Sequence, residues 1–177
     1  MTWDPDSSRQ PPADWATDSA TADASAVPST HFQAMCEFFR GESWKYDAIE
    51  GQSALRLGCS GENGDWTCYA QVRDEPPRFL FYSVLNVRAI EASRTSVAEL
   101  LTRVNYGMVL GSFEMDFGDG EIRCKTSAPL SDVAAARELF HTLVYTNLLA
   151  TDRYLPAVMS VIYAGMSPEQ AIARVDG

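Results

Sequence analysis

Hydrophobic and polar residues alternate on both sides of Asp119-Gly120, a dipeptide that favours a two-residue type I′ turn. This pattern predicts a β-hairpin over residues 111–126 with one apolar face and one charged face. The expected apolar pairs are Phe117 with Ile122, Met115 with Cys124 and Phe113 with Thr126. The expected charged pairs are Asp116 with Arg123 and Glu114 with Lys125, each contributing about 0.2–1 kcal/mol.

Alternation also extends through residues 43–87 and predicts a four-stranded antiparallel meander. The expected strands are 43–50, 53–60, 65–73 and 78–87, with two-residue turns at Gly51-Gln52 and Asn63-Gly64. In this register the core-facing pairs are Trp44 with Cys59, Tyr46 with Leu57, Ala48 with Leu55, Cys59 with Cys68, Leu57 with Ala70, Leu55 with Val72, Val72 with Phe79 and Ala70 with Phe81, and Leu85 extends the row.

The fourth strand is apolar on both of its faces. Leu80, Tyr82 and Val84 point away from the core row and continue onto Tyr69 of the third strand. This second face needs a cover, which could be a helix of the same chain, a second subunit or a bound partner segment. We take Tyr69, Leu80, Tyr82 and Val84 as candidate partner contacts.

Apolar residues at helical spacing predict four helices. The first is capped by Ser29 or Thr30 and ends at Gly41, and the second covers residues 95–108. A long third helix is capped by Ser131 and is kinked or divided at Pro156, and a short fourth helix begins at Ser167-Pro168. The predicted fold is therefore α+β, with helices packed on an antiparallel sheet in the order α-β-β-β-β-α-β-β-α-α.

The chain of 177 residues carries a formal net charge of −10, which argues against nucleic-acid binding and against anionic membranes. Residues 1–28 are acidic and poor in apolar residues, so we predict a disordered tail there and a single domain over 29–177. Trp3 and Trp15 are its exceptions, either as docking anchors for a partner or as incidental hydrophobes. No apolar run could span a membrane and no signal peptide is recognisable, so the simplest expected location is cytoplasmic.

No residue pattern predicts catalysis, a metal site or a cofactor. Two histidines are too few for a multi-histidine metal site, and the carboxylates flank cations or lie in loops. The four cysteines lack zinc-finger and CxxC spacing. Cys59 and Cys68 are expected to face each other, which allows either two buried structural thiols or a strained, reducible disulfide.

Three segments resemble the YbjN family: Tyr82-Ser-Val-Leu-Asn-Val, Asn105-Tyr106 before Gly111-Ser-Phe-Glu-Met-Asp, and Asp152-Arg-Tyr-Leu-Pro-Ala-Val-Met-Ser-Val-Ile-Tyr. The similarity covers about residues 30–175. It implies a bacterial protein with a fold similar to type III secretion chaperones, which commonly dimerise and hold partner polypeptides. It also implies a regulatory or adaptor role, brings no catalytic residue, and does not include the acidic tail.

These observations favour a non-enzymatic adaptor or chaperone-like regulator that holds a partner polypeptide. One alternative is a thiol redox sensor acting through Cys59 and Cys68. Another is a homodimeric structural or stress-regulatory module that associates through the long helix or the second hairpin.

Overall fold

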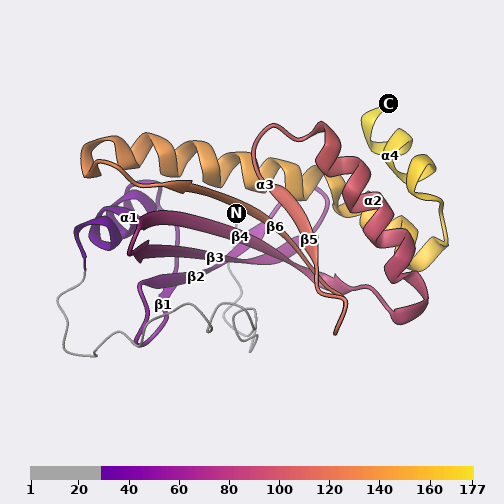
Figure 1. The fold of residues 1–177 in the computed structure, drawn as a ribbon, viewed down its shortest axis with the longest axis horizontal. Coiled ribbons are helices and arrows are strands. Elements are labelled where there is room, and N and C mark those ends of the chain that lie inside the picture. The colour runs from indigo at the N-terminus through magenta and orange to yellow at the C-terminus, as the bar shows by residue number, and fades with distance from the viewer. Residues whose placement is uncertain (1–28) are drawn as a thin grey trace.

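The protein is described by a computed structural model over residues 29–177, and these residues form one α+β domain (Figure 1). A six-stranded antiparallel sheet has the strand order β1-β2-β3-β4-β6-β5, so the meander and the hairpin join where β6 pairs with β4. Four helices and one short 3-10 turn complete the domain, and the helices and strands follow the predicted order. Their bounds are α1 Thr30–Gly41, β1 Asp47–Ala48, β2 Ala54–Ser60, β3 Asp65–Asp74, β4 Pro77–Arg88, η2 Glu91–Ser93, α2 Arg94–Gly107, β5 Ser112–Met115, β6 Glu121–Pro129, α3 Val133–Ala164 and α4 Pro168–Asp176.

The main hydrophobic core lies between the sheet and the helices. Figure 1 shows α1 and α3 along one face of the sheet, with α2 and α4 packed near the end of α3. Aromatic rings join the layers: the Phe79 ring of β4 lies 4.6 Å from that of Phe140 on α3, and the Phe81 ring stacks 6.3 Å from Phe39 on α1. The core row predicted for β4 is therefore the face that the helices cover.

The long helix α3 is continuous from Val133 to Ala164 and contains Pro156 in its interior, so the expected division at this proline is wrong. Its N-cap is Asp132, whose carboxylate accepts a hydrogen bond from the Ala134 amide, and not Ser131. Asn147 fixes this helix to the sheet, because its buried side-chain amide donates to the main-chain oxygens of Phe81 at 3.2 Å and Cys124 at 3.0 Å.

The predicted registers are confirmed for two of the strand pairs. Between β3 and β4, Val72 lies opposite Phe79 and Ala70 opposite Phe81, and Ala48 lies opposite Leu55 between β1 and β2. The first expected strand is much shorter than predicted, however, because β1 contains only Asp47 and Ala48. The rings of Trp44 and Tyr46 lie outside this strand and pack against Phe39 instead.

The other two predicted registers are wrong by two residues. Between β2 and β3 the pairs are Leu55 with Ala70, Leu57 with Cys68 and Cys59 with Trp66, and between β5 and β6 they are Phe113 with Cys124 and Met115 with Ile122. Both connections are longer than a two-residue turn. Because side chains alternate with a period of two, this shift keeps every paired residue on its predicted face.

The tip of the second hairpin differs most from the prediction. Phe117 was expected on the apolar face, but its side chain is 60 % exposed, because the chain leaves the ladder after Met115. Arg123 lies opposite Glu114 and not opposite Asp116 as expected, and Glu114 forms ion pairs with both Arg123 and Lys125.

Two side chains outside the strands hold this hairpin in place. Asn105 of α2 donates to the Phe113 main-chain oxygen at 2.9 Å and accepts from the Phe113 amide at 2.7 Å. The helix α2 therefore supplies hydrogen-bond partners for the main chain at the outer edge of β5. At the tip, Asp119 pairs with Arg88 of β4.

No helix in the described chain is both long and apolar enough to cross a lipid bilayer.

Candidate functional site

The four residues predicted to contact a partner lie side by side on the second face of the sheet, which is the face opposite α1 and α3. Tyr69 of β3 is paired with Tyr82 of β4, and Leu80 and Val84 flank Tyr82 on the same face. All four side chains are buried, with exposed fractions of 1 % for Tyr69, 7 % for Leu80, 5 % for Tyr82 and 3 % for Val84. They form a hydrophobic cluster with Ala54, against which Ile49 packs.

Within residues 29–177, no helical residue belongs to this cluster. A cover by a helix of the same chain, which was one expectation from the sequence, is therefore not found in that range. A buried aromatic face without a packed helix distinguishes this side of the sheet from the core side. We call the strand residues on this side the second face.

Basic side chains border the cluster on the second face. The register places Arg56 beside Tyr69, Lys125 beside Tyr82 and Arg123 beside Val84, and places Arg73 opposite Arg78 one row beyond Leu80. The Arg123 guanidinium also lies 5.0 Å from the centroid of the Tyr82 ring, a cation–π distance. In these rows five cations stand against two carboxylates, Asp47 and Glu114, although the whole chain has a net charge of −10.

Both carboxylates form ion pairs with cations beside the centre of the cluster. Asp47 pairs with Arg56 at 3.1 Å, and Glu114 pairs with Arg123 at 2.8 Å and with Lys125. The row of Arg73 and Arg78 ends at Pro129 of β6 and contains no carboxylate. Among the strand residues, this row therefore holds two arginines, of which Arg73 donates a hydrogen bond to the Gln71 side chain at 3.2 Å.

The thiols of Cys59 and Cys68 lie together although the predicted direct pairing is wrong. Cys59 is opposite Trp66, so the two cysteines are diagonal neighbours, and their Sγ atoms are 3.0 Å apart. Both are free and buried on the core side. The hydrogen bond with Cys68, together with burial, raises the pKa of the Cys59 thiol well above its usual value. This environment disfavours the thiolate that thiol chemistry requires.

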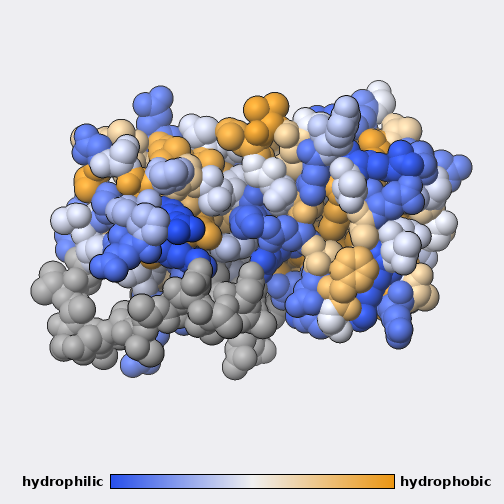
Figure 2. Space-filling view, viewed as in Figure 1, coloured by the Kyte–Doolittle hydropathy of each residue, from blue (hydrophilic) through white to orange (hydrophobic). Residues whose placement is uncertain are grey.

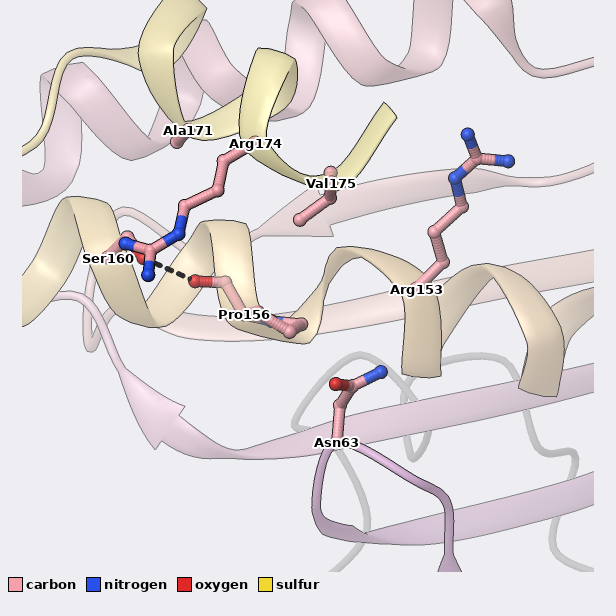
Figure 3. A pocket seen from close by; sticks show the side chains of 7 residues that line it. All are labelled: Asn63, Arg153, Pro156, Ser160, Ala171, Arg174 and Val175. Carbon is pink, nitrogen blue, oxygen red and sulfur yellow. Dashed lines mark hydrogen bonds between the residues drawn. The ribbon is translucent and has the colours of Figure 1, made fainter. Parts of the chain in front are cut away.

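A pocket of about 440 Å³ lies between α3, α4 and the β2–β3 connection (Figure 3). Its lining residues are Asn63, Arg153, Pro156, Ser160, Ala171, Arg174 and Val175. Arg153 forms an ion pair with Asp176 at 2.8 Å, and the Ser160 hydroxyl donates to the Pro156 main-chain oxygen at 2.8 Å. Arg153 and Arg174 thus give the lining positive charge. Its one hydroxyl, that of Ser160, already donates a hydrogen bond within α3, and no histidine, cysteine or carboxylate is among the lining residues.

Beside this pocket, hydrogen bonds of Asp152 connect the β2–β3 connection to α3. The sequence did not reveal this role. The Asp152 carboxylate accepts from the Asn63 amide at 2.9 Å and from the Glu62 amide at 3.2 Å. The Asn63 side chain donates to the Asp152 main-chain oxygen at 3.1 Å. Pro156 lacks the amide hydrogen that would bond to this oxygen within the helix, so Asn63 replaces the missing partner.

The remaining sequence expectations concern the two tryptophans of the acidic segment and a metal site. Trp3 and Trp15 lie outside the described residues. Over residues 29–177, no group of three or more His, Cys, Asp or Glu side chains is arranged to hold a metal ion. Figure 2 shows apolar side chains gathered where the α2–β5 connection passes beside α3, and Val109 and Leu110 in this connection are 96 % and 42 % exposed.

The fold and the second face define a small α+β protein with one six-stranded antiparallel sheet, helices on one face and an aromatic, basic surface on the other. Residues 31–160 match the YbjN family, described as "Putative bacterial sensory transduction regulator", and the chain belongs to this family. No curated protein matches the chain.

Among solved structures, the chain is similar to the "Crystal structure of YbjN, a putative transcription regulator from E. coli". The similarity has a TM-score of 0.50 at 12 % sequence identity, and it covers 79 % of this chain and 93 % of that one. At this identity the likeness concerns the fold.

Proposed function

We propose that this protein is a non-enzymatic regulatory adaptor that holds a partner polypeptide on the second face of its sheet. The observation that carries the proposal is the buried aromatic cluster around Tyr69 and Tyr82, which no helix of residues 29–177 covers. The description of the YbjN family as a regulator supports the same class of function.

The composition of the second face specifies the kind of segment that it binds. Apolar and aromatic side chains at its centre favour a segment with large hydrophobic anchors, as in most protein interfaces. The surrounding cations, which include Arg73 and Arg78, favour carboxylates beside those anchors. The proposed partner segment is therefore acidic and contains large hydrophobic residues.

Site-specific photo-crosslinking in the native host tests this proposal. Ser127 is an exposed residue of β6 that lies opposite Leu80, so Ser127→p-benzoylphenylalanine places the crosslinker at the edge of the second face. Thr102→p-benzoylphenylalanine on the exposed side of α2 is the matched control. We expect an acidic peptide from one discrete partner to be crosslinked at Ser127 but not at Thr102.

The charge-reversal pair Arg73→Glu and Arg78→Glu, introduced together with the Ser127 crosslinker, should lower this yield several-fold. Neither residue is part of the hydrophobic core, so circular dichroism should show an unchanged fold. Equal crosslinking at Ser127 and Thr102, or a yield that ignores the charge reversal, would argue against the proposed surface.

A second candidate function is a thiol redox sensor, because the Sγ atoms of Cys59 and Cys68 lie only 3.0 Å apart. A peroxide could oxidise the two thiols to a disulfide with release of water. The raised pKa of Cys59 and the burial of both residues oppose this reaction. Mass spectrometry after mild peroxide treatment decides: a Cys59–Cys68 bridge supports the sensor, and two intact thiols remove it.

A further inference from the structure

The second face is covered, yet its cluster contains no helical residue from the described part of the chain. Tyr69 is 1 % exposed, and Val84 and Tyr82 are 3 % and 5 % exposed. A sheet face open to water would leave such large side chains much more accessible. Such burial on a face without a helix favours a further segment as its cover, and the cluster and its cations favour one with apolar anchors and negative charge.

We propose that the acidic N-terminal segment, residues 1–28, is an intramolecular ligand of the second face and competes there with the partner polypeptide. This inference rests on the proposed function, because it makes the partner surface self-occupied. Release of the segment would then be the step that controls access of the partner.

Charge complementarity favours this occupant. Residues 1–28 contain five aspartates and one arginine, a net charge of −4 in a segment without lysine or glutamate. The aspartates are Asp4, Asp6, Asp14, Asp18 and Asp23. The second face has the opposite sign, with five cations against two carboxylates in the rows around the cluster. Opposite charges brought together in this way select one partner over others and orient it.

The segment also supplies the required apolar anchors. Trp3 and Trp15 are its two aromatic residues, twelve positions apart and each within three residues of an aspartate. Tryptophan is among the residues that contribute most to binding at protein interfaces. An indole against Tyr69 and Tyr82, with neighbouring carboxylates directed at the arginines, would satisfy both properties of the face.

The length and the attachment point of the segment allow this contact. The segment joins the domain at Ser29, immediately before α1, which packs against β3. An extended chain of 28 residues reaches about 90 Å, whereas six strands span about 24 Å from the first to the last. The segment can therefore pass around the end of the sheet and still cross the whole second face.

Intramolecular photo-crosslinking in the purified full-length protein tests the inference. The crosslinker is again Ser127→p-benzoylphenylalanine, with Thr102→p-benzoylphenylalanine as control. Equal amounts of light and isotopically heavy protein are mixed before irradiation, so that crosslinks within one chain can be told from crosslinks between two chains. We expect peptides from residues 1–28 to be joined to Ser127 within the same chain, and none to Thr102.

Two sets of charge variants add a readout that a folding defect would not reproduce. Arg73→Glu with Arg78→Glu should lower the intramolecular yield several-fold. Changing Asp14, Asp18 and Asp23 to lysine in that same protein should restore the yield, because the opposite charges are then exchanged. A yield that is unaffected by the arginine changes, or that is not restored by the lysines, overturns the inference.

The remaining outcomes separate the inference from the proposed function. Crosslinks from Ser127 only to a second copy, or to no peptide of the purified protein, would show that residues 1–28 are not the occupant. If a host partner is still crosslinked at Ser127 in that case, the proposed function stands without self-occupation. The opposite result is that residues 1–28 are crosslinked to Ser127 in the purified protein while no host partner is crosslinked there. The segment would then be only an intramolecular cover, and the adaptor function would be contradicted.

Discussion

Asp152 shows how one residue can connect parts of the chain that are far apart in the sequence. Its carboxylate accepts hydrogen bonds from Glu62 and Asn63, which precede it by about ninety positions. The close approach leaves no room at Gly61, where an added Cβ would lie 2.1 Å from Asp152 Oδ1. Asp152 lies in one of the segments that resemble the YbjN family, and its contact with the β2–β3 connection gives a structural reason for its presence.

The replacement Asp152→Ala should therefore lower the free energy of unfolding by about 1–2 kcal/mol, since two backbone amides lose a charged acceptor. Urea denaturation followed by circular dichroism measures the change. Arg153→Ala is the matched control, because its ion pair with Asp176 is largely exposed and should contribute less than about 0.5 kcal/mol. Equal effects of both replacements would show that the Asp152 contacts contribute little.

Burial at Cys124 makes a prediction about reactivity with pH. Burial raises the pKa of this thiol to about 12, so the folded protein favours the neutral form. Only the thiolate is alkylated, and its fraction at pH 8 is then about 10⁻⁴. Iodoacetamide should modify Cys124 at least about a thousandfold more slowly in the folded chain than in urea, with a rate that rises towards pH 12. Similar rates of Cys124 modification in the folded chain and in urea at pH 8 would contradict the burial of this thiol.

At the scale of elements, the sequence predicted which residues share a face more reliably than which residues pair. The dipeptides Asn63-Gly64 and Asp119-Gly120 both suggested two-residue turns, but each belongs to a longer connection. Asn63 is engaged by Asp152, and Gly120 approaches Ala89. These contacts involve residues distant in the sequence, so local turn preferences could not reveal them. The even shift in register preserved the two faces.

Gly120 allows a direct test of this account of the hairpin tip. Its φ angle is +77°, and an added Cβ would lie 2.0 Å from the Ala89 main-chain oxygen. Gly120→Ala should therefore lower the free energy of unfolding by about 2–4 kcal/mol, from backbone strain and displacement of Ala89, which directly follows β4. Gly51→Ala is the control, because its φ is +71° but no atom would lie within 4 Å, so only about 1 kcal/mol is expected. Thermal unfolding of both variants gives the comparison.

At the scale of the whole molecule, the sheet has a core side, which the helices cover, and the second face. The long helix, the core row of β4 and the two-sided character of this strand were all predictable from the hydrophobic pattern. The sequence placed Arg123 and Lys125 on the charged face of the hairpin, but it did not group them with Arg56, Arg73 and Arg78. These five cations come from four strands and meet only after the sheet is assembled. The strand order brings these cations together, and this grouping favours an acidic ligand.

The same division explains why an acidic chain can attract an acidic segment. The negative charge is spread over the sequence, whereas the positive excess is confined to a few rows of one face. Screening at high ionic strength weakens such an attraction, because the Debye length falls from about 10 Å at 0.1 M to about 3 Å at 1 M salt. Binding to the second face should therefore weaken as salt is added.

The most direct measurement of the central claim is the NMR signal of the Tyr69 and Tyr82 rings in the full-length protein. Spectra of the native sequence are compared with those of a variant in which Asp4, Asp6, Asp14, Asp18 and Asp23 are all asparagine. If residues 1–28 occupy the second face through their carboxylates, both ring signals should shift in the variant, while the signal of the 96 % exposed Tyr106 should not. Unchanged Tyr69 and Tyr82 signals would contradict this occupation of the second face.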